Sequence, residues 1–344
     1  MTRRVAVVLF NLGGPDSPEA VRPFLFNLFH DPAIISLPQP LRWLVARLIS
    51  GGRHKTAQAI YARIGGSSPL VKETEAQRQA LADLLCNTMP DLEIEVVVAM
   101  RYWRPFTKAA AAQVEAFAPD DIILLPLYPQ FSTTTTGSSL LEWNKVYKGG
   151  TAAHAVCCYP ESPGLIEAHA RQIEATVASA RATQPLRIIF SAHGLPQKII
   201  DGGDPYQHQV ERSAAALARR LNAADWRVSY QSRVGPLKWI GPSTIEALEE
   251  AGRDKAGVVV VPIAFVSEHS ETLVELDIEY RELAEHAGVP LYLRAPDIGV
   301  QPPFIEELAA MVAQALSSPA IAPYGAPCQG RFPKCPLQCK AKGA

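Results

Sequence analysis

A histidine follows a short apolar run and stands beside a glycine. Residues 188–190 are all apolar, and Ser191-Ala192-His193-Gly194 come next. Imidazole titrates near neutral pH, so it can accept a proton or bind a metal ion. A lone histidine here more often only hydrogen-bonds at a strand end. A chemical role therefore requires partners from another part of the chain.

An acidic row supplies such partners. Four glutamates recur at spacings of three and four residues: Glu268, Glu271, Glu275 and Glu279. On a helix they would share one edge. A solvated helix face usually explains such a row, and early glutamates also stabilise a helix N-terminus. Like charges at this spacing repel, however, and the row begins beside His269. Carboxylates and imidazoles together suit ferrous iron and proton transfer.

Two further groups of residues are chemically suggestive. Trp239 lies in a loop held by Gly235-Pro236 and Gly241-Pro242, and its ring can either pack in the core or face a flat conjugated ligand.

Three of the six cysteines lie close together near the end of the chain: Cys328, Cys335 and Cys339. Three thiolates are one short of a Cys₄ site. A zinc site and thiols that bind nothing are the alternatives.

The elements that must position these residues alternate between short apolar runs and helical patterns. Strands are expected at 5–11, 92–99, 122–127, 153–158, 186–191, 228–231, 258–263 and 291–293, and helices at 72–85, 165–180 and 205–221. Several strands are apolar on both faces, as in a covered parallel sheet. The alternation predicts an α/β fold with two Rossmann-like, doubly wound sheets. Ligands of such folds bind beyond the carboxyl ends of the strands, where His193 and His269 fall.

Lys148-Gly149-Gly150 separates two runs of this alternation. We expect a first domain over 1–150, a second over 151–320 and a cysteine-containing extension over 321–344.

Residues 32–52 are unusually apolar. Buried, this segment would be a core helix; exposed, it would be an apolar lip suited to a greasy ligand or a membrane surface. Composition alone favours the core helix.

Composition excludes several classes of function. The 344 residues include 33 basic and 34 acidic ones, a formal net charge of -1, so no basic field attracts nucleic acid. The G-x-G-x-x-G and P-loop patterns are absent, which argues against nucleotide cofactors. No apolar stretch approaches the roughly 20 residues that span a bilayer, and the run at 5–10 is short for a secretory signal. We expect a cytoplasmic protein.

Together these segments resemble the ferrochelatases. Eight motifs match that family in order over nearly the whole chain: Asn11-Leu12-Gly13-Gly14-Pro15, Ile64-Gly65-Gly66-Ser67-Ser68-Pro69-Leu70, Met100-Arg101-Tyr102-Trp103, Leu127-Tyr128-Pro129-Gln130-Phe131-Ser132, Thr136-Gly137-Ser138-Ser139, Ser191-Ala192-His193-Gly194-Leu195-Pro196, Gln231-Ser232-Arg233-Val234-Gly235-Pro236 and Phe265-Val266-Ser267-Glu268-His269-Ser270-Glu271-Thr272-Leu273. The last three are highly specific. The resemblance implies two chelatase-like domains that enclose a porphyrin cleft. It also implies insertion of Fe²⁺, a substrate, into protoporphyrin IX, with release of two protons, as the last step of haem biosynthesis.

The resemblance also assigns roles to residues. His193 and Glu271 are the implied catalytic residues and ligands of the incoming Fe²⁺, and Glu275 and Glu279 the implied proton or metal path. The implied substrate-binding residues are Leu12, Tyr61, Ser68, Arg101, Tyr102, Ser232, Trp239, Phe265 and His269. Residues 32–52 match the family's hydrophobic lip, which replaces the core-helix interpretation and implies peripheral contact with the inner face of a membrane.

Some ferrochelatases carry a [2Fe–2S] cluster on a C-terminal extension, and this tail resembles that of the bacterial members. In animal members the fourth cysteine lies in the segment corresponding to 132–135, which has none here. Cys157 and Cys158 can substitute, as in some bacterial members. On a strand they would point to opposite faces, so only one should serve. We expect Cys158, nearer the strand end, with Cys328, Cys335 and Cys339.

Two other functions stay open. A related chelatase would act on another tetrapyrrole or metal, such as coproporphyrin or cobalt. A non-catalytic porphyrin carrier would need the cleft and the lip but not an acidic proton path, so the glutamate row counts against it.

Overall fold

The computed structural model describes residues 2–181, 185–233, 235–318, 322–325, 327–328 and 330–336. The chain divides into two compact units. The first comprises Met1–Cys157 and Leu308–Pro323, and the second Cys158–Glu307 and Tyr324–Ala344. The domain boundaries expected from the sequence, after residues 150 and 320, stay predictions.

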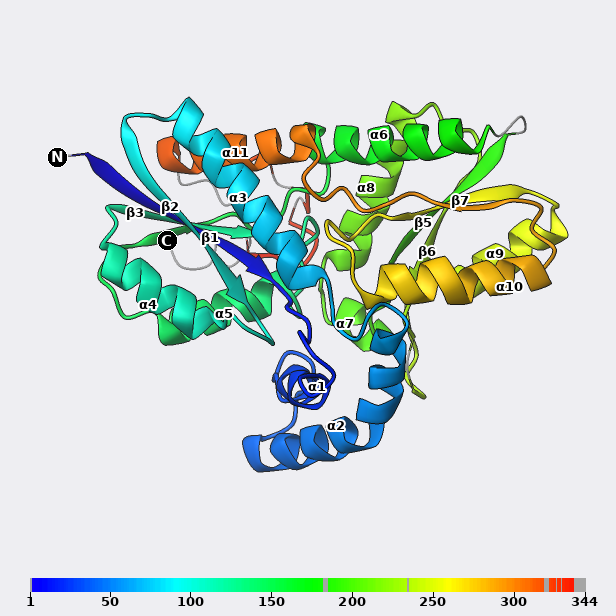
Figure 1. The fold of residues 1–344 in the computed structure, drawn as a ribbon, viewed down its shortest axis with the longest axis horizontal. Helices are drawn as coiled ribbons and strands as arrows, with labels where there is room; N and C mark the ends of the chain where they lie inside the picture. The colour runs from blue at the N-terminus through cyan, green and yellow to red at the C-terminus, as the bar shows by residue number, and fades with distance from the viewer. Residues whose placement is uncertain are drawn as a thin grey trace. The chain divides into compact units, whose positions relative to one another are not determined.

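A four-stranded parallel sheet in the order β2-β1-β3-β4 forms the centre of the first unit (Figure 1). Its strands are β1 (Arg3–Asn11), β2 (Leu92–Met100), β3 (Asp121–Pro126) and β4 (Ala153–Ala155). The helices are α1 (Val21–Phe29), α2 (Gln39–Ala62), α3 (Leu70–Thr88), α4 (Thr107–Phe117) and α5 (Thr136–Val146), and α11 (Pro302–Ser317) ends in this unit. Alternate β1 side chains, Ala6, Val8 and Phe10, pack against α4 and Trp143 of α5.

The second unit has the same plan, with a parallel sheet in the order β6-β5-β7-β8. Its strands are β5 (Leu186–His193), β6 (Trp226–Gln231), β7 (Gly257–Pro262) and β8 (Tyr292–Arg294). Its helices are α6 (Pro163–Ala180), α7 (Gln197–Asp201), α8 (Tyr206–Arg220), α9 (Thr244–Arg253), η1 (Glu271–Glu279) and α10 (Tyr280–His286).

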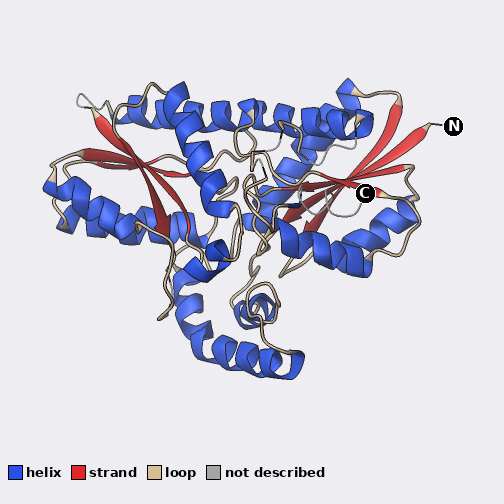
Figure 2. Ribbon diagram, turned by 180° about the vertical axis from the view of Figure 1, so that it is seen from behind, coloured by secondary structure: helices blue, strands red, loops and turns tan. Residues whose placement is uncertain are grey.

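Side chains of β5 explain why helices cover both faces of this second sheet. Ile188 and Phe190 pack in one apolar cluster with α6 and α8. Ile189, between them in sequence, packs in another with α9 and α10. Successive strand residues point to opposite faces, so a strand that is apolar throughout needs cover on both. Figure 2 shows helices on either side of the strands in each unit, and the predicted α/β fold is confirmed.

One strand is shorter than the sequence predicts. β4 ends at Ala155, whereas the apolar pattern runs to residue 158. Cys157 and Cys158 therefore lie beyond the strand, both buried. The expectation that strand alternation sends them to opposite faces does not apply to them.

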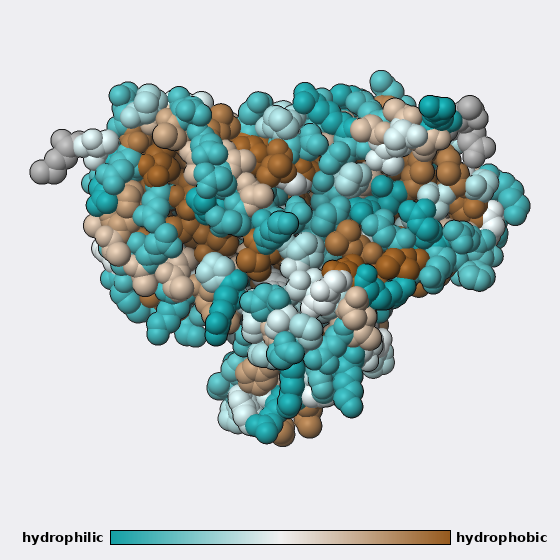
Figure 3. Space-filling view, in the orientation of Figure 1, coloured by the Kyte–Doolittle hydropathy of each residue, from teal (hydrophilic) through white to brown (hydrophobic). Residues whose placement is uncertain are grey.

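The apolar segment at 32–52 forms the turn before α2 and the first half of that helix. Ala46 and Ser50 are buried, while Leu41, Trp43, Leu44 and Leu48 are between 43% and 65% exposed. Figure 3 shows apolar atoms among polar ones at the bottom of the view, where α2 lies. The core-helix interpretation is wrong for this outer face. Among the described residues, no helix has both the length and the apolar composition needed to cross a bilayer.

Candidate functional site

Three neighbouring strand ends bring the predicted catalytic residues together in the second unit. β5 ends at His193. This residue is paired with Gln231, the last residue of the neighbouring strand β6. β7 lies on the other side of β5 and ends at Pro262, from which a turn leads through His269 to η1. Because parallel strands end at the same edge of a sheet, these segments meet there.

A glycine allows the two strand ends to approach closely. The backbone N–H of Gly194 donates to the carbonyl oxygen of Gln231 at 2.9 Å. A Cβ atom at position 194 would lie only 2.8 Å from that oxygen and 3.5 Å from Cε3 of Trp239. Any side chain here would push the strands apart and displace His193.

Glu271 binds both histidines. Its Oε2 lies 2.8 Å from Nδ1 of His193 and 3.6 Å from Nε2 of His269. The side chains of His193 and Glu271 are 37% and 31% exposed, whereas His269 is nearly buried. The ring centroid of His269 is 4.3 Å from that of Phe265. The site is thus a carboxylate–imidazole pair that remains accessible, backed by a second imidazole and an aromatic ring.

The electrostatics of the pair favour charge on both partners. Burial alone would lower the pKa of His193, but the Glu271 carboxylate outweighs burial and raises it. Burial would likewise raise the pKa of Glu271, yet His193 and His269 hold it well below its usual value. Glu271 is therefore ionised throughout the neutral range, and His193 takes up a proton more readily than a free imidazole.

Glu275 has the opposite character. Burial, reinforced by the charge of Glu271, raises its pKa. Its oxygens accept hydrogen bonds from the backbone N–H and hydroxyl of Ser232, from the amide of Gln231 and from Tyr280, whose hydroxyl is 2.7 Å away. Two adjacent carboxyl groups with pKa values shifted in opposite directions can hold and pass on a proton.

The acidic row is carried by a π-helix rather than the α-helix on which the spacing argument relied. Such helices are rare and often occur at functional sites. Glu268 does not belong to the row: it precedes the helix and lies 2.5 Å from Arg294, which also binds Asp277. Glu279 is exposed at the last position of η1.

The other predicted substrate residues of the second unit flank this site. Ser232 follows β6 with a left-handed φ of 62° and bonds to Glu275. Trp239 is half-buried, and its segment forms an isolated bridge with Pro196. Its indole nitrogen is buried without a hydrogen-bond partner among the described residues.

In the first unit, the predicted residues gather at the carboxyl ends of β1 and β2. The backbone N–H groups of Arg101 and Tyr102 donate to the carbonyl oxygens of Asn11 and Leu12, each at 2.9 Å. Ser68 lies against the same loop, since a Cβ at Gly14 would overlap its side chain. Tyr61 is buried near the end of α2. Tyr102 is wholly buried, so it supports the site from behind.

Sequence reasoning missed Asp31, the carboxylate that the Tyr102 hydroxyl and Arg101 both contact. It also missed Gln231, whose amide bonds to the Glu271 carbonyl oxygen at 3.0 Å. Asp31 sits in the turn before the apolar lip, and no local pattern marks it. The position of Gln231 beside Ser232 at a strand end was a signal that could have identified it.

Three of the four proposed cluster ligands lie in the second unit, and the fourth, Cys339, lies outside the described residues. Cys158, Cys328 and Cys335 are all buried. The side-chain amide of Gln209 donates to Sγ of Cys328 at 3.1 Å and to Sγ of Cys158 at 3.5 Å. Contact with Cys335, together with burial, raises the pKa of Cys328.

These buried thiols are the donor type that iron–sulfur clusters use. Within the described ranges, no three His, Cys, Asp or Glu side chains already have the arrangement of a metal site. The residues fit the predicted cluster in the type of donor atom, and the cluster itself stays a prediction.

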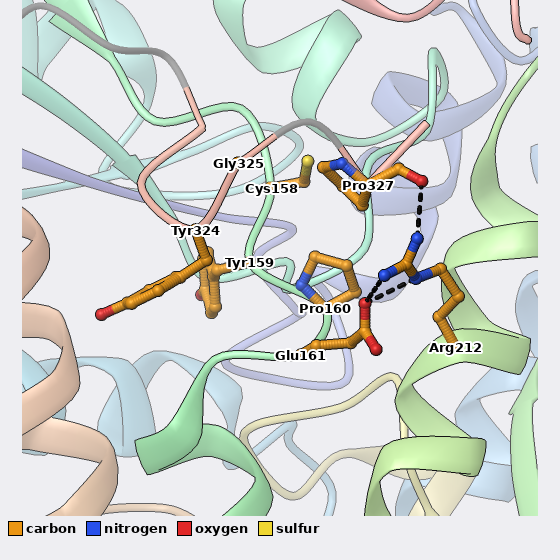
Figure 4. A pocket seen from close by; sticks show the side chains of 8 residues that line it. All are labelled: Cys158, Tyr159, Pro160, Glu161, Arg212, Tyr324, Gly325 and Pro327. Atoms are coloured by element: carbon orange, nitrogen blue, oxygen red, sulfur yellow. Dashed lines mark hydrogen bonds and ion pairs between the residues drawn. The ribbon is translucent and has the colours of Figure 1, made fainter. Parts of the chain in front are cut away.

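A pocket of about 230 Å³ adjoins Cys158 (Figure 4). Arg212 of α8 crosses one side of it, binding the carboxylate of Glu161 and, at 2.9 Å, the carbonyl oxygen of Pro327. His208 also contacts that carbonyl oxygen, and its ring lies 5.2 Å from that of Phe332. Helix α8 thus holds the described part of the tail near Cys158.

Comparison with solved structures supports the fold. SirB from Bacillus subtilis subspecies spizizenii, a sirohydrochlorin chelatase in complex with cobalt, matches with a TM-score of 0.51 and 10% identity, covering 92% of this chain and 96% of that one. A multi-domain protein of Deinococcus radiodurans with structural similarity to chelatases matches with a TM-score of 0.52 and 16% identity, covering 91% of this chain and 55% of that one.

Comparison of sequences is more specific. The family model described as Ferrochelatase matches residues 4–316. The ferrochelatase of Phenylobacterium zucineum is 60% identical, covering 94% of each chain. The ferrochelatase of Caulobacter vibrioides is 55% identical, covering 98% of this chain and 99% of the relative. The site of His193 and Glu271 thus occurs in a chain that, by family model and by identity over nearly its full length, belongs to the ferrochelatase family.

Proposed function

We propose that this chain inserts ferrous iron into protoporphyrin IX to form protohaem, the last step of haem biosynthesis, and that His193 and Glu271 perform the chemistry. Membership of the ferrochelatase family supports the reaction. The single observation that supports the residues is the 2.8 Å contact between His193 Nδ1 and Glu271 Oε2 at a partly exposed strand end. Iron is a substrate here, and no nucleotide cofactor takes part.

The reaction must remove two pyrrole N–H protons and strip water from the iron. Glu271 engages Nδ1 of His193, which leaves Nε2 to accept a pyrrole proton or to bind the incoming ion. The carboxylate stabilises the imidazolium that forms. This is the ordinary role of a carboxylate that is hydrogen-bonded to the far nitrogen of a histidine base.

A proton on His193 then has a path inward. Glu271 stays ionised, whereas Glu275 behind it has a raised pKa and is surrounded by hydrogen-bond donors. A proton is therefore more stable on the carboxyl group of Glu275 than on that of Glu271. Glu279, exposed at the end of η1, opens this path to solvent.

Groups in each unit are available to bind the porphyrin. In the second unit these are Ser232, Trp239, Phe265 and His269; in the first, they are Leu12, Tyr61, Ser68 and Arg101, with the wholly buried Tyr102 supporting them from behind. Hydroxyl and guanidinium groups suit the porphyrin carboxylates, and the aromatic rings suit the flat macrocycle.

The exposed face of α2 contacts a membrane surface in this proposal. Leu41, Leu44 and Leu48 are exposed, and Arg42 and Arg47 belong to the same helix. Apolar side chains interleaved with cations suit the boundary of an anionic bilayer. The protein would then act in the cytoplasm, at the inner face of the membrane, where its apolar substrate partitions.

A [2Fe–2S] cluster would be held by Cys158, Cys328, Cys335 and Cys339. When bound, the cluster supplies a link between the tail and the body of the second unit and a group that responds to oxidants. Gln209 would orient two of the thiolates, and Arg212 would hold the tail through the carbonyl oxygen of Pro327.

The proposal is tested by anaerobic incubation of the full chain with ferrous iron and a panel of porphyrins, followed by absorbance. We expect protoporphyrin IX to be metallated and His193→Ala to be inactive on it. Faster metallation of coproporphyrin would reassign the substrate. Tight porphyrin binding with no metallation would make the chain a carrier.

A further inference from the structure

Asp31 is a buried carboxylate of the first unit that the mechanism above does not use. It lies between α1 and α2 and is 4% exposed. Its Oδ1 accepts a hydrogen bond from the backbone N–H of Ala33 at 2.8 Å, in the turn that leads into α2. A buried carboxylate is costly unless donors surround it. The groups that donate to Asp31 therefore show which side chains it holds in place.

Three side chains contact the other oxygen, Oδ2: two hydroxyl groups donate hydrogen bonds to it, and a guanidinium forms an ion pair with it. The Tyr102 hydroxyl is 2.7 Å away and Nη2 of Arg101 is 2.9 Å away, while the Ser138 hydroxyl makes a short hydrogen bond. Arg101 and Tyr102 follow β2, and Ser138 lies in the first turn of α5. Oδ2 of Asp31 thus connects the segment after β2 and the first turn of α5 to the turn that precedes the lip.

Arg101 is held at two points by this arrangement. Its Nη2 binds Asp31, and its Nε donates to the Ser138 hydroxyl at 2.7 Å. A guanidinium has five N–H groups, so others remain for a ligand besides the one that donates to Ser138. A free arginine side chain loses rotamer entropy when a ligand fixes it, and these two contacts fix Arg101 before any ligand arrives.

Tyr102 completes the arrangement. Burial, and then the charge of Asp31, raises the pKa of Tyr102 well above its usual value. The phenol stays protonated and remains a donor to Asp31 at neutral pH. The carboxylate therefore keeps its partners across the working range.

We propose that Asp31 is a positioning residue for porphyrin binding: with Ser138 it aims Arg101 at the substrate. This inference rests on the proposed function, in which Arg101 contacts the porphyrin. Asp31 itself is too buried to touch the ligand. Its effect on binding should therefore pass through Arg101 and disappear when Arg101 is replaced.

A double-mutant cycle tests this route. The dissociation constant of protoporphyrin IX is measured by quenching of tryptophan fluorescence for the wild type, Asp31→Asn, Arg101→Gln and the double variant, with thermal unfolding of each. We expect Asp31→Asn to weaken binding about tenfold, and the double variant to bind no more weakly than Arg101→Gln alone. Asp121→Asn is the control, since it breaks an Asp–Arg pair with Arg3 in the same unit and should leave affinity unchanged.

Other outcomes would contradict either the positioning role of Asp31 or the binding role of Arg101. An equal further loss when Asp31→Asn is added to Arg101→Gln would make Asp31 a purely structural residue. Unchanged affinity in Asp31→Asn, with weakened binding in Arg101→Gln, would overturn this inference and leave the proposed function standing. Unchanged affinity in Arg101→Gln would remove Arg101 from the proposed site, and the role of Asp31 with it. If Asp31→Asn does not fold, Ser138→Ala enters the same cycle, because it frees Nε of Arg101 and keeps every charge.

Discussion

Nδ1 of His193 lies 2.8 Å from Oε2 of Glu271, although the two residues are 78 positions apart in the chain. Each depends on its neighbour for its protonation behaviour, since Glu271 raises the pKa of His193 and His193 lowers that of Glu271. The pair occupies the carboxyl edge of a parallel sheet, where ligands of this fold class bind. The predictions below treat the pair as one functional unit.

His193→Ala should abolish metal insertion and leave porphyrin binding largely intact. The imidazole is 37% exposed and packs in neither apolar cluster of the second sheet, so its loss should cost little stability. General-base catalysis contributes about 10²–10⁴-fold. The rate of haem formation and the affinity for protoporphyrin IX are measured separately. Near-normal turnover would remove His193 from the mechanism.

Glu271→Gln should move the pH dependence as well as slow the reaction. His193 must be deprotonated at Nε2 to accept a pyrrole proton, so kcat/KM should fall as the pH falls through its raised pKa. The glutamine removes the main charge that raises this pKa, and it leaves burial, which lowers the pKa more than the remaining charge of Glu275 raises it. The acidic limb of the residual kcat/KM profile should therefore shift to lower pH. A limb that stays in place, or moves to higher pH, would mean that another group controls it.

Glu275→Gln should reduce the rate by slowing proton removal while affinity for the porphyrin stays within about twofold. Its carboxyl group is ringed by donors from Ser232, Gln231 and Tyr280, and an amide there can accept a hydrogen bond but cannot carry a proton onward. Steady-state kinetics give the comparison, with Glu282→Gln on α10 as the control. Equal rates in the two variants would exclude a proton path through Glu275.

Aspartate at Leu44 and Leu48 of α2 should weaken binding to anionic lipid vesicles and to the porphyrin without unfolding the protein. Both side chains are about half-exposed or more, so a charge there costs little in water. Ala46→Asp on the buried side of the same helix is the control and should lower the melting temperature sharply. Retained vesicle and porphyrin binding by the Leu44 and Leu48 variants would show that the lip has neither role.

Much of this site follows from the sequence, because strand ends are local features. Apolar runs mark where β5 and β6 stop, and His193 at the end of β5 and Ser232 just after β6 lie at the edge of the sheet where ligands bind. Asp31 could not be found in this way: its contact with Ser138 spans 107 positions and depends on how α5 packs. The spacing of the glutamates also could not distinguish a π-helix from an α-helix. The end of β4 at Ala155 was missed because an apolar run continues past the last paired residue.

The last prediction concerns the tail. Protein purified without oxygen should be red-brown, with about two irons and two sulfides per chain, and Cys335→Ser should bleach it and lower its stability.

Gln209→Leu should keep the fold but make the cluster harder to reduce, since the amide N–H groups that face Cys158 and Cys328 would stabilise the added negative charge. A tenfold change in the ratio of reduced to oxidised cluster corresponds to 59 mV for a one-electron couple, which redox titration resolves. Gln172→Leu is the matched control, because that amide in α6 bonds to the carbonyl oxygen of Asp297. Colourless wild-type protein with one bound zinc would make the tail a zinc site. A red wild type whose potential is the same in Gln209→Leu would keep the cluster and remove Gln209 from its control.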